Sequence, residues 1–275
     1  MTTSNPYIFG DPAIDRQRLV TQTQLFSNYI LANAHRLVGS DIRRILDLGC
    51  GEGQLGLLLQ ELYRPQAQLV GIDKDERAIT TARARAQELG RARVEFEVGD
   101  AMAPESVAPG PFDLVYISFL LMHLPRPDQA LAGAYNTLRP GGYVWVKDLH
   151  LDTRTAIKHP SFKKLGDVMA DTMTAIGVNS FISVQVPALL TAAGFTEIRE
   201  EVEEYALGGS TAEGQATLAT ILGAFRHAQA MISRVSKVPE SEIERWYLDI
   251  CSAALRSDKE LGRARYANIV ARRPQ

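Results

Sequence analysis

Short apolar runs alternate with longer amphipathic stretches through the middle of the chain. Apolar runs lie at residues 43–51, 68–73, 94–100, 112–119 and 143–149, and helical spacing fills residues 53–63, 76–90 and 126–142. The runs have the length and composition of buried strands, while Gly90 and Pro140 are typical helix stops. This alternation predicts a doubly wound, mostly parallel α/β sheet, and such sheets bind ligands at the carboxyl ends of their strands.

The flanking segments complete the predicted architecture. Helical patterns occupy much of residues 1–40, 151–181, 186–195 and 211–260, the last interrupted at Pro239, and strand patterns occupy residues 196–209 and 262–274. These patterns predict a seven-stranded sheet. We divide the chain into a helical N-terminal cap (1–40), a sheet core (41–150) and a region (151–275) that adds an antiparallel strand pair carrying a helical lid.

The predicted lid carries two apolar stripes at helical spacing. They contain Phe162, Met169, Met173, Phe181, Leu218, Ile221, Leu222, Phe225, Met231, Trp246 and Tyr247. Such stripes more often pack between helices than line a pocket. Any of these residues that did line a pocket would select a partly apolar ligand.

Composition excludes several classes of protein. Lys plus Arg is 30 and Asp plus Glu is 32, a net charge of −2, so the chain lacks the excess of cations with which proteins hold nucleic acid. The only two cysteines, Cys50 and Cys251, form no C-x-x-C pair and favour a reducing, cytoplasmic location. We expect no signal peptide, no membrane span and no metal site, because none of their sequence patterns is present.

The most informative segment is the glycine-rich turn that follows the first predicted strand. It contains Asp47, Gly49, Cys50 and Gly51, and it leads into a predicted helix. Glycines permit a tight turn and close approach of the backbone to a ligand. A dinucleotide-binding turn has a third glycine where this chain has Gln54, and a carboxylate at Asp47 would repel a pyrophosphate. The same carboxylate would attract a ligand that carries an ammonium or sulfonium charge.

Two further acidic residues end the next two predicted strands. Asp73 is placed to accept hydrogen bonds from both ribose hydroxyls of a nucleoside, although it could instead cap the following helix, for which Asp75 is the better candidate. Asp100 can accept from an exocyclic adenine amine while the amide of Ala101 donates to a ring nitrogen, or Asp100 can be an ordinary turn residue. Ser118 ends the fourth strand and would lie beneath the reactive group.

Together these motifs resemble the class I S-adenosylmethionine-dependent methyltransferases over residues 41–150. The resemblance rests on D-x-G-x-G-x-G from Asp47, the acid after the second strand, the G-D-A turn at 99–101, the strand at 112–118 and L-R-P-G-G at 138–142. It is nearest to the small-molecule subgroup related to ubiquinone and menaquinone biosynthesis. The resemblance implies a Rossmann-like core that binds S-adenosylmethionine and releases S-adenosylhomocysteine.

The resemblance also implies roles for individual residues. The methionine half would be held by Asp47, Gly49, Cys50 and Gly51, the ribose by Asp73, and the adenine by Asp100 and Ala101, with Lys74 and Ser118 alongside. Tyr7, Arg18 and Gln24 would close over the cofactor from the N-terminal segment, although a solvated surface position is the simpler interpretation of Arg18.

Methyl transfer from a sulfonium is an in-line displacement that depends on alignment. A base is needed only where the acceptor must lose a proton, and His123 after the fourth strand is the candidate for that role. A structural histidine that caps the following turn is the alternative. His150 and His159 fit loop positions better, and Asp148 and Asp152 fall short of a metal cluster.

The sequence favours a small, partly apolar acceptor, such as a quinone-like molecule or another secondary metabolite. The segments typical of adenine, cytosine and protein-arginine methyltransferases are absent from it. Methylation of RNA or protein, a non-catalytic cofactor-binding module and an NAD-linked oxidoreductase remain the alternatives. The acceptor atom (O, N or C) stays open, and a homodimer is compatible with the sequence.

Overall fold

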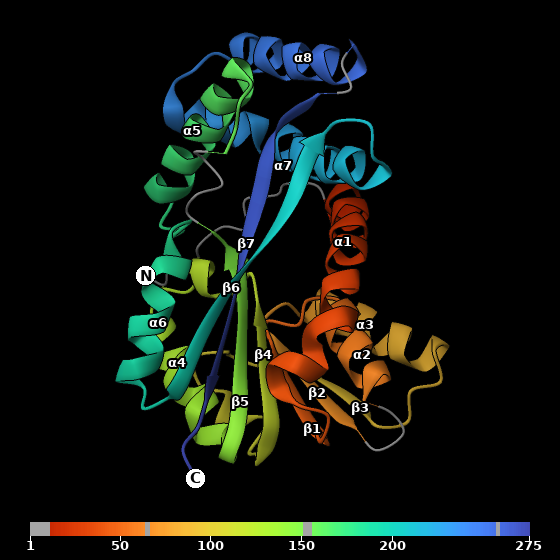
Figure 1. The fold of residues 1–275 in the computed structure, drawn as a ribbon, viewed down its shortest axis with the longest axis vertical. Helices are drawn as coiled ribbons and strands as arrows, with labels where there is room; N and C mark the ends of the chain where they lie inside the picture. Colours follow the sequence, from red (N-terminus) through yellow and green to blue (C-terminus); the bar gives the residue numbers. More distant parts are fainter. Residues whose placement is uncertain (1–11, 64–66, 151–155, 257–258) are drawn as a thin grey trace. The chain divides into compact units, whose positions relative to one another are not determined.

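The computed structural model describes residues 12–63, 67–150, 156–256 and 259–275, and the side chains of these ranges from residue 23 onward. Strands and helices alternate through the first half of the chain (Figure 1). The strands are β1 (Arg44–Leu48), β2 (Gln68–Asp73), β3 (Val94–Val98), β4 (Phe112–Ser118), β5 (Leu138–Leu149), β6 (Thr196–Gly208) and β7 (Glu260–Arg272). The helices are α1 (Pro12–Val38), α2 (Gln54–Leu62), α3 (Glu76–Glu88), α4 (Pro127–Thr137), α5 (Pro160–Ala175), α6 (Ile182–Ala192), α7 (Ala212–Ser236), α8 (Glu240–Arg256), and the short 3-10 helices η1 (Pro104–Ser106) and η2 (Leu121–His123).

The seven strands form one sheet in the order β3-β2-β1-β4-β5-β7-β6. The pairs β1–β2, β1–β4, β2–β3 and β4–β5 are parallel. The Thr196 hydroxyl at the start of β6 donates a hydrogen bond to the carbonyl oxygen of Arg272 at the end of β7. The arrows of β6 and β7 point in opposite directions in Figure 1. The predicted doubly wound sheet with a final antiparallel pair is therefore confirmed.

The chain separates into two compact units. The sheet unit comprises residues 27–148, 182–202 and 267–275. The helical unit comprises the described parts of residues 12–26, 149–181 and 203–266, and it contains α5, α7 and α8.

Helices cover both faces of the sheet within the sheet unit (Figure 1). The α2 and α3 helices and residues 27–38 of α1 pack on one face, while α4 and α6 lie on the other. Strands buried on both faces have continuous apolar runs, which is the pattern seen in the sequence. The buried residues shared by the first face include Ile30, Leu37, Ile45, Leu57, Leu59, Leu69, Phe96, Leu114, Tyr116 and Trp145.

The clearest difference between the predicted and the observed element boundaries is at the start of β5. The helix expected over residues 126–142 ends at Thr137, and β5 begins at Leu138 rather than at Tyr143. Pro140 favours an extended conformation in the residue before it, and Gly141 adopts a left-handed φ of 77°. The pairing between β4 and β5 is irregular at this point, so the strand absorbs a segment that local pattern assigned to the helix.

The helical unit has its own apolar core. Phe162 of α5 and Phe225 of α7 lie edge to face with their ring centroids 6.0 Å apart. Most residues of the two apolar stripes are buried here, among them Phe162, Met169, Met173, Leu218, Leu222, Phe225 and Trp246. Phe181, Ile221, Met231 and Tyr247 are half-buried. The stripes thus serve mainly as helix core, as their spacing favoured.

The close approach of Gly71 to Phe96 gives a prediction about stability. A methyl group added at Gly71 in β2 would overlap the Phe96 ring on β3, while the backbone conformation of this glycine is ordinary. We expect Gly71→Ala to lower the free energy of unfolding by about 1–3 kcal/mol through overpacking. The same change should cost clearly less in a Phe96→Leu background, as measured by urea unfolding. Equal costs in the two backgrounds would contradict this explanation.

Candidate functional site

The turn between β1 and α2 is held in shape by main-chain hydrogen bonds. Gly49, Gly51 and Gly53 have left-handed φ angles of 72°, 53° and 79°, which glycine adopts without steric cost. The amides of Gly49 and Cys50 both donate to the carbonyl oxygen of Ile72, at 2.8 and 3.0 Å. The turn is thereby anchored to the end of β2, with its glycine backbone at the carboxyl edge of the sheet.

Asp73, the last residue of β2, receives two backbone amides. The Gly51 amide donates to its Oδ2 at 2.9 Å, and the Asp75 amide donates to its Oδ1 at 3.0 Å. Asp75, in turn, is the N-cap of α3 and accepts from the amide of Arg77 at 2.9 Å. The structure thus assigns the helix cap to Asp75 and places the Asp73 carboxylate against the glycine turn.

Asp47 is the second carboxylate beside this turn, and it is only 3% exposed. A Cβ atom added to Gly56 would lie only 2.5 Å from Asp47 Oδ2, so α2 passes very close to this carboxylate. The Gly56 amide donates a hydrogen bond to the carboxylate. Burial, and then the negative charge of Asp73, raise the pKa of Asp47 to about 7. A cation bound near the turn would relieve this repulsion and favour the ionised carboxylate.

Two neighbours of the turn fix its packing. The buried Cys50 side chain has a raised thiol pKa, caused mainly by burial and further by Asp47 and Asp73, so it stays a neutral thiol. Leu120, just after β4, packs against the backbone of Gly49, and a Cβ atom added to Gly49 would lie only 2.7 Å from Leu120 Cδ1. A larger residue at Gly49 would therefore displace Leu120.

The ends of β3 and β4 supply further candidate residues. Asp100 is exposed and accepts from the amide of Met102 at 2.9 Å, in the manner of a turn aspartate, and Ala101 is buried. The Ser118 hydroxyl oxygen is buried and has no hydrogen-bond partner among the described residues. Phe119 follows with a left-handed φ of 51°, a conformation that is costly for a bulky side chain and is often found at functional sites.

His123 lies in η2, close after β4, and is largely shielded from solvent. Burial, and then the positive charge of Lys74, lower its pKa to about 4. The effect of Lys74 places His123 near the residue that follows Asp73. The imidazole is consequently neutral at physiological pH and able to accept a proton.

The described structure brings the predicted site residues at the ends of β1, β2, β3 and β4 to one edge of the sheet. Tyr7 lies outside the described residues, and the side chain of Arg18 in α1 is also outside them. Gln24 is exposed on α1 in the helical unit. Sequence reasoning, conversely, missed Gly56, Leu120 and Arg85, which contact the turn residues from other elements. Nothing in local sequence pattern marks such long-range contacts.

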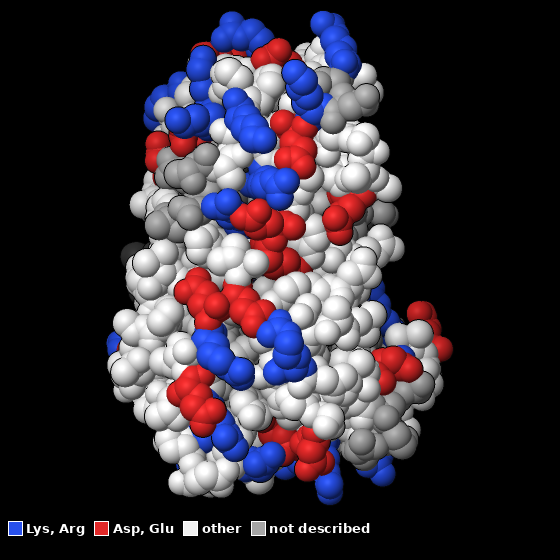
Figure 2. All heavy atoms as spheres, viewed as in Figure 1, with Lys and Arg blue, Asp and Glu red and all other residues white. Residues whose placement is uncertain are grey.

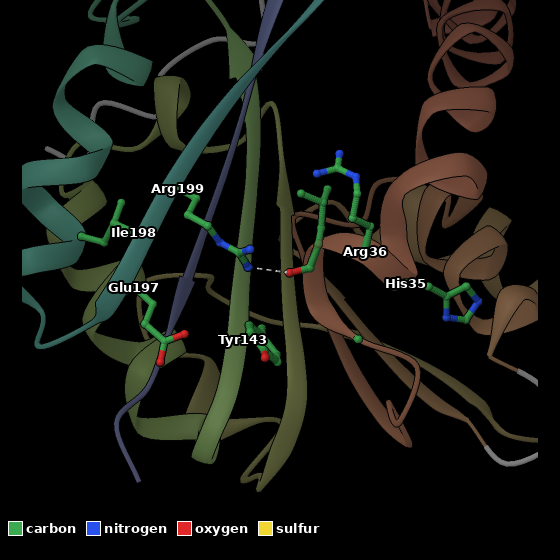
Figure 3. A pocket seen from close by; sticks show the side chains of 8 residues that line it. His35, Arg36, Tyr143, Glu197, Ile198 and Arg199 are labelled. Atoms are coloured by element: carbon green, nitrogen blue, oxygen red, sulfur yellow. Dashed lines mark hydrogen bonds between the residues drawn. The ribbon is translucent and has the colours of Figure 1, made fainter.

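A depression in the sheet unit lies away from this edge (Figure 3). It is lined by His35, Arg36, Leu37, Gly39, Tyr143, Glu197, Ile198 and Arg199. Tyr143 pairs with Leu114 near the start of β4, so the depression is at the amino-terminal edge of the sheet. Arg199 donates to the carbonyl oxygen of Leu37 at 3.0 Å, which stabilises the end of α1. Because the glycine turn lies at the opposite, carboxyl edge of the sheet, this depression is not part of the site that the turn forms.

Other kinds of site find no support in the described part of the chain. Among those residues, no cluster of His, Cys, Asp or Glu is suited to a metal ion. No helix described is both long enough and apolar enough to cross a bilayer. Figure 2 shows basic and acidic side chains interspersed on the visible face. Ion pairs of this kind include those of Arg263 and Arg265 with Glu204.

Comparison with known proteins identifies the family. A family model described as a methyltransferase domain matches residues 40–204. The ubiquinone biosynthesis O-methyltransferase of Aliivibrio fischeri is 30% identical over 128 residues, which are 46% of this chain and 52% of that protein. The chain therefore aligns with about half the length of this curated relative.

Solved structures share the fold at lower identity. A [4+2]-cyclase, SpnF, has a TM-score of 0.56 at 23% identity, covering 90% of this chain and 80% of its own. A phosphoethanolamine N-methyltransferase of Haemonchus contortus, in complex with S-adenosyl-L-methionine, has a TM-score of 0.54 at 20% identity, covering 93% and 56%. Because the family model matches more than half of its residues, the chain belongs to the methyltransferase-domain family of class I S-adenosylmethionine-dependent enzymes, which confirms the resemblance seen in its sequence.

Proposed function

We propose that this protein transfers the methyl group of S-adenosylmethionine to a small, partly apolar acceptor and releases S-adenosylhomocysteine. The observation that supports this most strongly is the glycine turn flanked by the carboxylates of Asp47 and Asp73. Two adjacent carboxylates suit a nucleoside that carries positive charge, whereas a pyrophosphate would be repelled. Gln54 in place of a third glycine is further support against a dinucleotide.

The proposed contacts follow the order of the strands. Asp47 and the backbone of Gly49, Cys50 and Gly51 hold the methionine half. Asp73 accepts the ribose hydroxyls through the lone pairs that its two amide donors leave available. The remaining contacts are with Lys74, with Asp100 and Ala101 at the adenine, and with Ser118 beneath the reactive group. Tyr7, Arg18 and Gln24 stay predictions for a segment that closes over the cofactor.

Methyl transfer requires the protein to align the acceptor with the methyl group more than it requires the protein to stabilise charge. When bound, S-adenosylmethionine supplies an electrophilic methyl group on a sulfonium that leaves as a neutral thioether. The protein orients the acceptor in line with that bond. We propose that neutral His123 takes the proton from an acceptor hydroxyl and that the buried Ser118 hydroxyl donates a hydrogen bond beneath the reactive group.

The acceptor class rests on the relatives and on charge. The curated relative is named for O-methylation in ubiquinone biosynthesis, so a quinol or phenol is the acceptor class that we favour. The near-zero net charge and the interspersed charges of Figure 2 support a small molecule over RNA. Two free cysteines fit a reducing, cytoplasmic location, and a homodimer remains a prediction.

An acceptor screen tests this function. The purified chain is incubated with methyl-labelled S-adenosylmethionine and separate panels of phenols and quinols, small amines, total RNA and protein. We expect label in the phenol and quinol panel, because the curated relative is named for O-methylation in ubiquinone biosynthesis. Label in RNA or protein alone would contradict the small-molecule assignment. Cofactor binding without transfer to any panel would favour the non-catalytic module.

Asp73 gives a direct test of the cofactor site, with Asp75 as a matched control. We expect Asp73→Ala to lower the affinity for S-adenosylhomocysteine by about 1–3 kcal/mol, because two hydrogen bonds to the ribose are lost. Asp75→Ala removes only the α3 cap and should cost about 1 kcal/mol of stability without changing affinity. Calorimetric titration and thermal unfolding measure the two effects. Unchanged affinity in Asp73→Ala would remove Asp73 from the site.

A His123 variant tests whether this residue has a catalytic or a structural role. We expect His123→Ala to lower kcat by about 10²–10⁴-fold with little change in cofactor affinity, as for the loss of a general base. In the wild type, kcat should stay level as the pH falls until it approaches the pKa of about 4, below which the imidazole is protonated. His35→Ala serves as the control, because His35 packs on Tyr63 at the far edge of the sheet. A stability loss with normal kcat would indicate the structural role.

A further inference from the structure

One helix side chain reaches across to the glycine turn and holds its central residue. Arg85, in the last turn of α3, donates from Nη1 to the carbonyl oxygen of Glu52 at 3.0 Å and from Nη2 to Glu52 Oε2 at 3.3 Å. Gln54 adds a weaker bond to the same carboxylate oxygen at 3.4 Å. The side chains of Arg85 and Glu52 are only 25% and 12% exposed, so solvent screens this pair less than a surface pair.

These bonds are made to the residue that lies between two glycines of the turn. Glu52 lies between Gly51 and Gly53, both in left-handed conformations. The amide of Gly51 is fixed by Asp73, and the amide of Gly53 is fixed by the carbonyl oxygen of Cys50. The carbonyl between these two points is the one that Arg85 binds. A planar guanidinium that binds a carbonyl and a carboxylate together restricts the rotation of both.

The charge of Arg85 matters as well as its geometry. Glu52 adds a third carboxylate to a turn that already has Asp47 and Asp73 beside it. The methionine half of the cofactor has a carboxylate of its own, which an uncompensated Glu52 would repel. Arg85 neutralises Glu52 from the side of α3, so the turn can accept an amino acid with both of its charges.

We propose that Arg85 is a positioning residue for the cofactor, and that it sets the affinity for the amino-acid half without contributing to the affinity for the adenosine half. The inference rests on the proposed function, because it assigns the methionine half to the glycine turn. Arg85 acts through the backbone and carboxylate of Glu52. A purely structural role for Arg85 would instead affect both halves of the ligand alike.

The same helix offers a matched control. Arg83 makes an equivalent pair of bonds, from Nε to the carbonyl oxygen of Phe96 at 2.7 Å and from Nη2 to Glu97 Oε2 at 2.9 Å. Those partners belong to β3 and not to the glycine turn. Replacing either arginine by Met keeps the aliphatic stem while removing the bonds and the charge.

The test compares two ligands. S-adenosylhomocysteine contains both halves, whereas 5′-methylthioadenosine has the adenosine but no amino-acid group. We expect Arg85→Met to weaken S-adenosylhomocysteine about 5- to 20-fold, because a less ordered turn and an unneutralised Glu52 together cost the ligand about as much as one hydrogen bond, and to change methylthioadenosine less than about twofold. Arg83→Met should change neither by more than about twofold. Arg85→Lys, which keeps the charge but not the fork, should fall in between.

Several outcomes overturn the proposal. Equal weakening of both ligands by Arg85→Met, or no weakening of either, contradicts it. If Arg85→Met does not fold, Arg85→Gln, which keeps a polar side chain but loses the charge and the guanidinium fork, takes its place, and the same preferential loss of S-adenosylhomocysteine affinity is expected. A wild-type protein that binds neither ligand would reject the proposed function itself, and the inference with it. If the wild type binds both ligands, a failed Arg85 prediction counts against the role of Arg85 alone and not against the proposed function.

Discussion

The site depends on how the chain turns from β1 into α2 between two carboxylates. Asp73 receives the amide of Gly51, and Asp47 is buried beneath the first turn of α2, where its Oδ2 approaches Gly56. Burial, and then the negative charge of Asp73, raise the pKa of Asp47 to about 7. A positively charged ligand is the simplest way to relieve that repulsion. We therefore propose that the turn selects a cation through the same residues that give it its shape.

The surrounding core explains why glycine recurs here. A Cβ atom added to Gly53 would lie only 2.5 Å from Cζ of the Phe96 ring. The same ring also leaves no space for a side chain on Gly71. Leu120 occupies the corresponding space beside Gly49. Apolar residues from β3 and from the segment after β4 thus support the backbone of the turn. The small residues that core packing requires are thus the ones to which we assign ligand binding.

Much of this architecture was predictable from the sequence because it depends on local pattern. The bounds of β2 match the predicted run of residues 68–73, and Asp75 caps α3 as expected. The helix predicted to reach residue 142 ends at Thr137, because pairing with β4 draws the following residues into the sheet. The bond between Arg85 and Glu52 spans 33 positions. Only the folded chain reveals such a contact, since periodicity reports which face a residue occupies but not its partner.

The fold alone does not determine the reaction, since a [4+2]-cyclase and an N-methyltransferase have the same architecture. The central claim concerns the charge that the glycine turn accepts, and calorimetric titration with S-adenosylhomocysteine and NADH at pH 6 and pH 8 tests it most directly. We expect S-adenosylhomocysteine to bind several-fold more tightly at pH 8, where Asp47 is ionised and attracts the ammonium group, and NADH to give no heat of binding at either pH. Binding of NADH at either pH, or failure of S-adenosylhomocysteine to bind at both, would contradict the account.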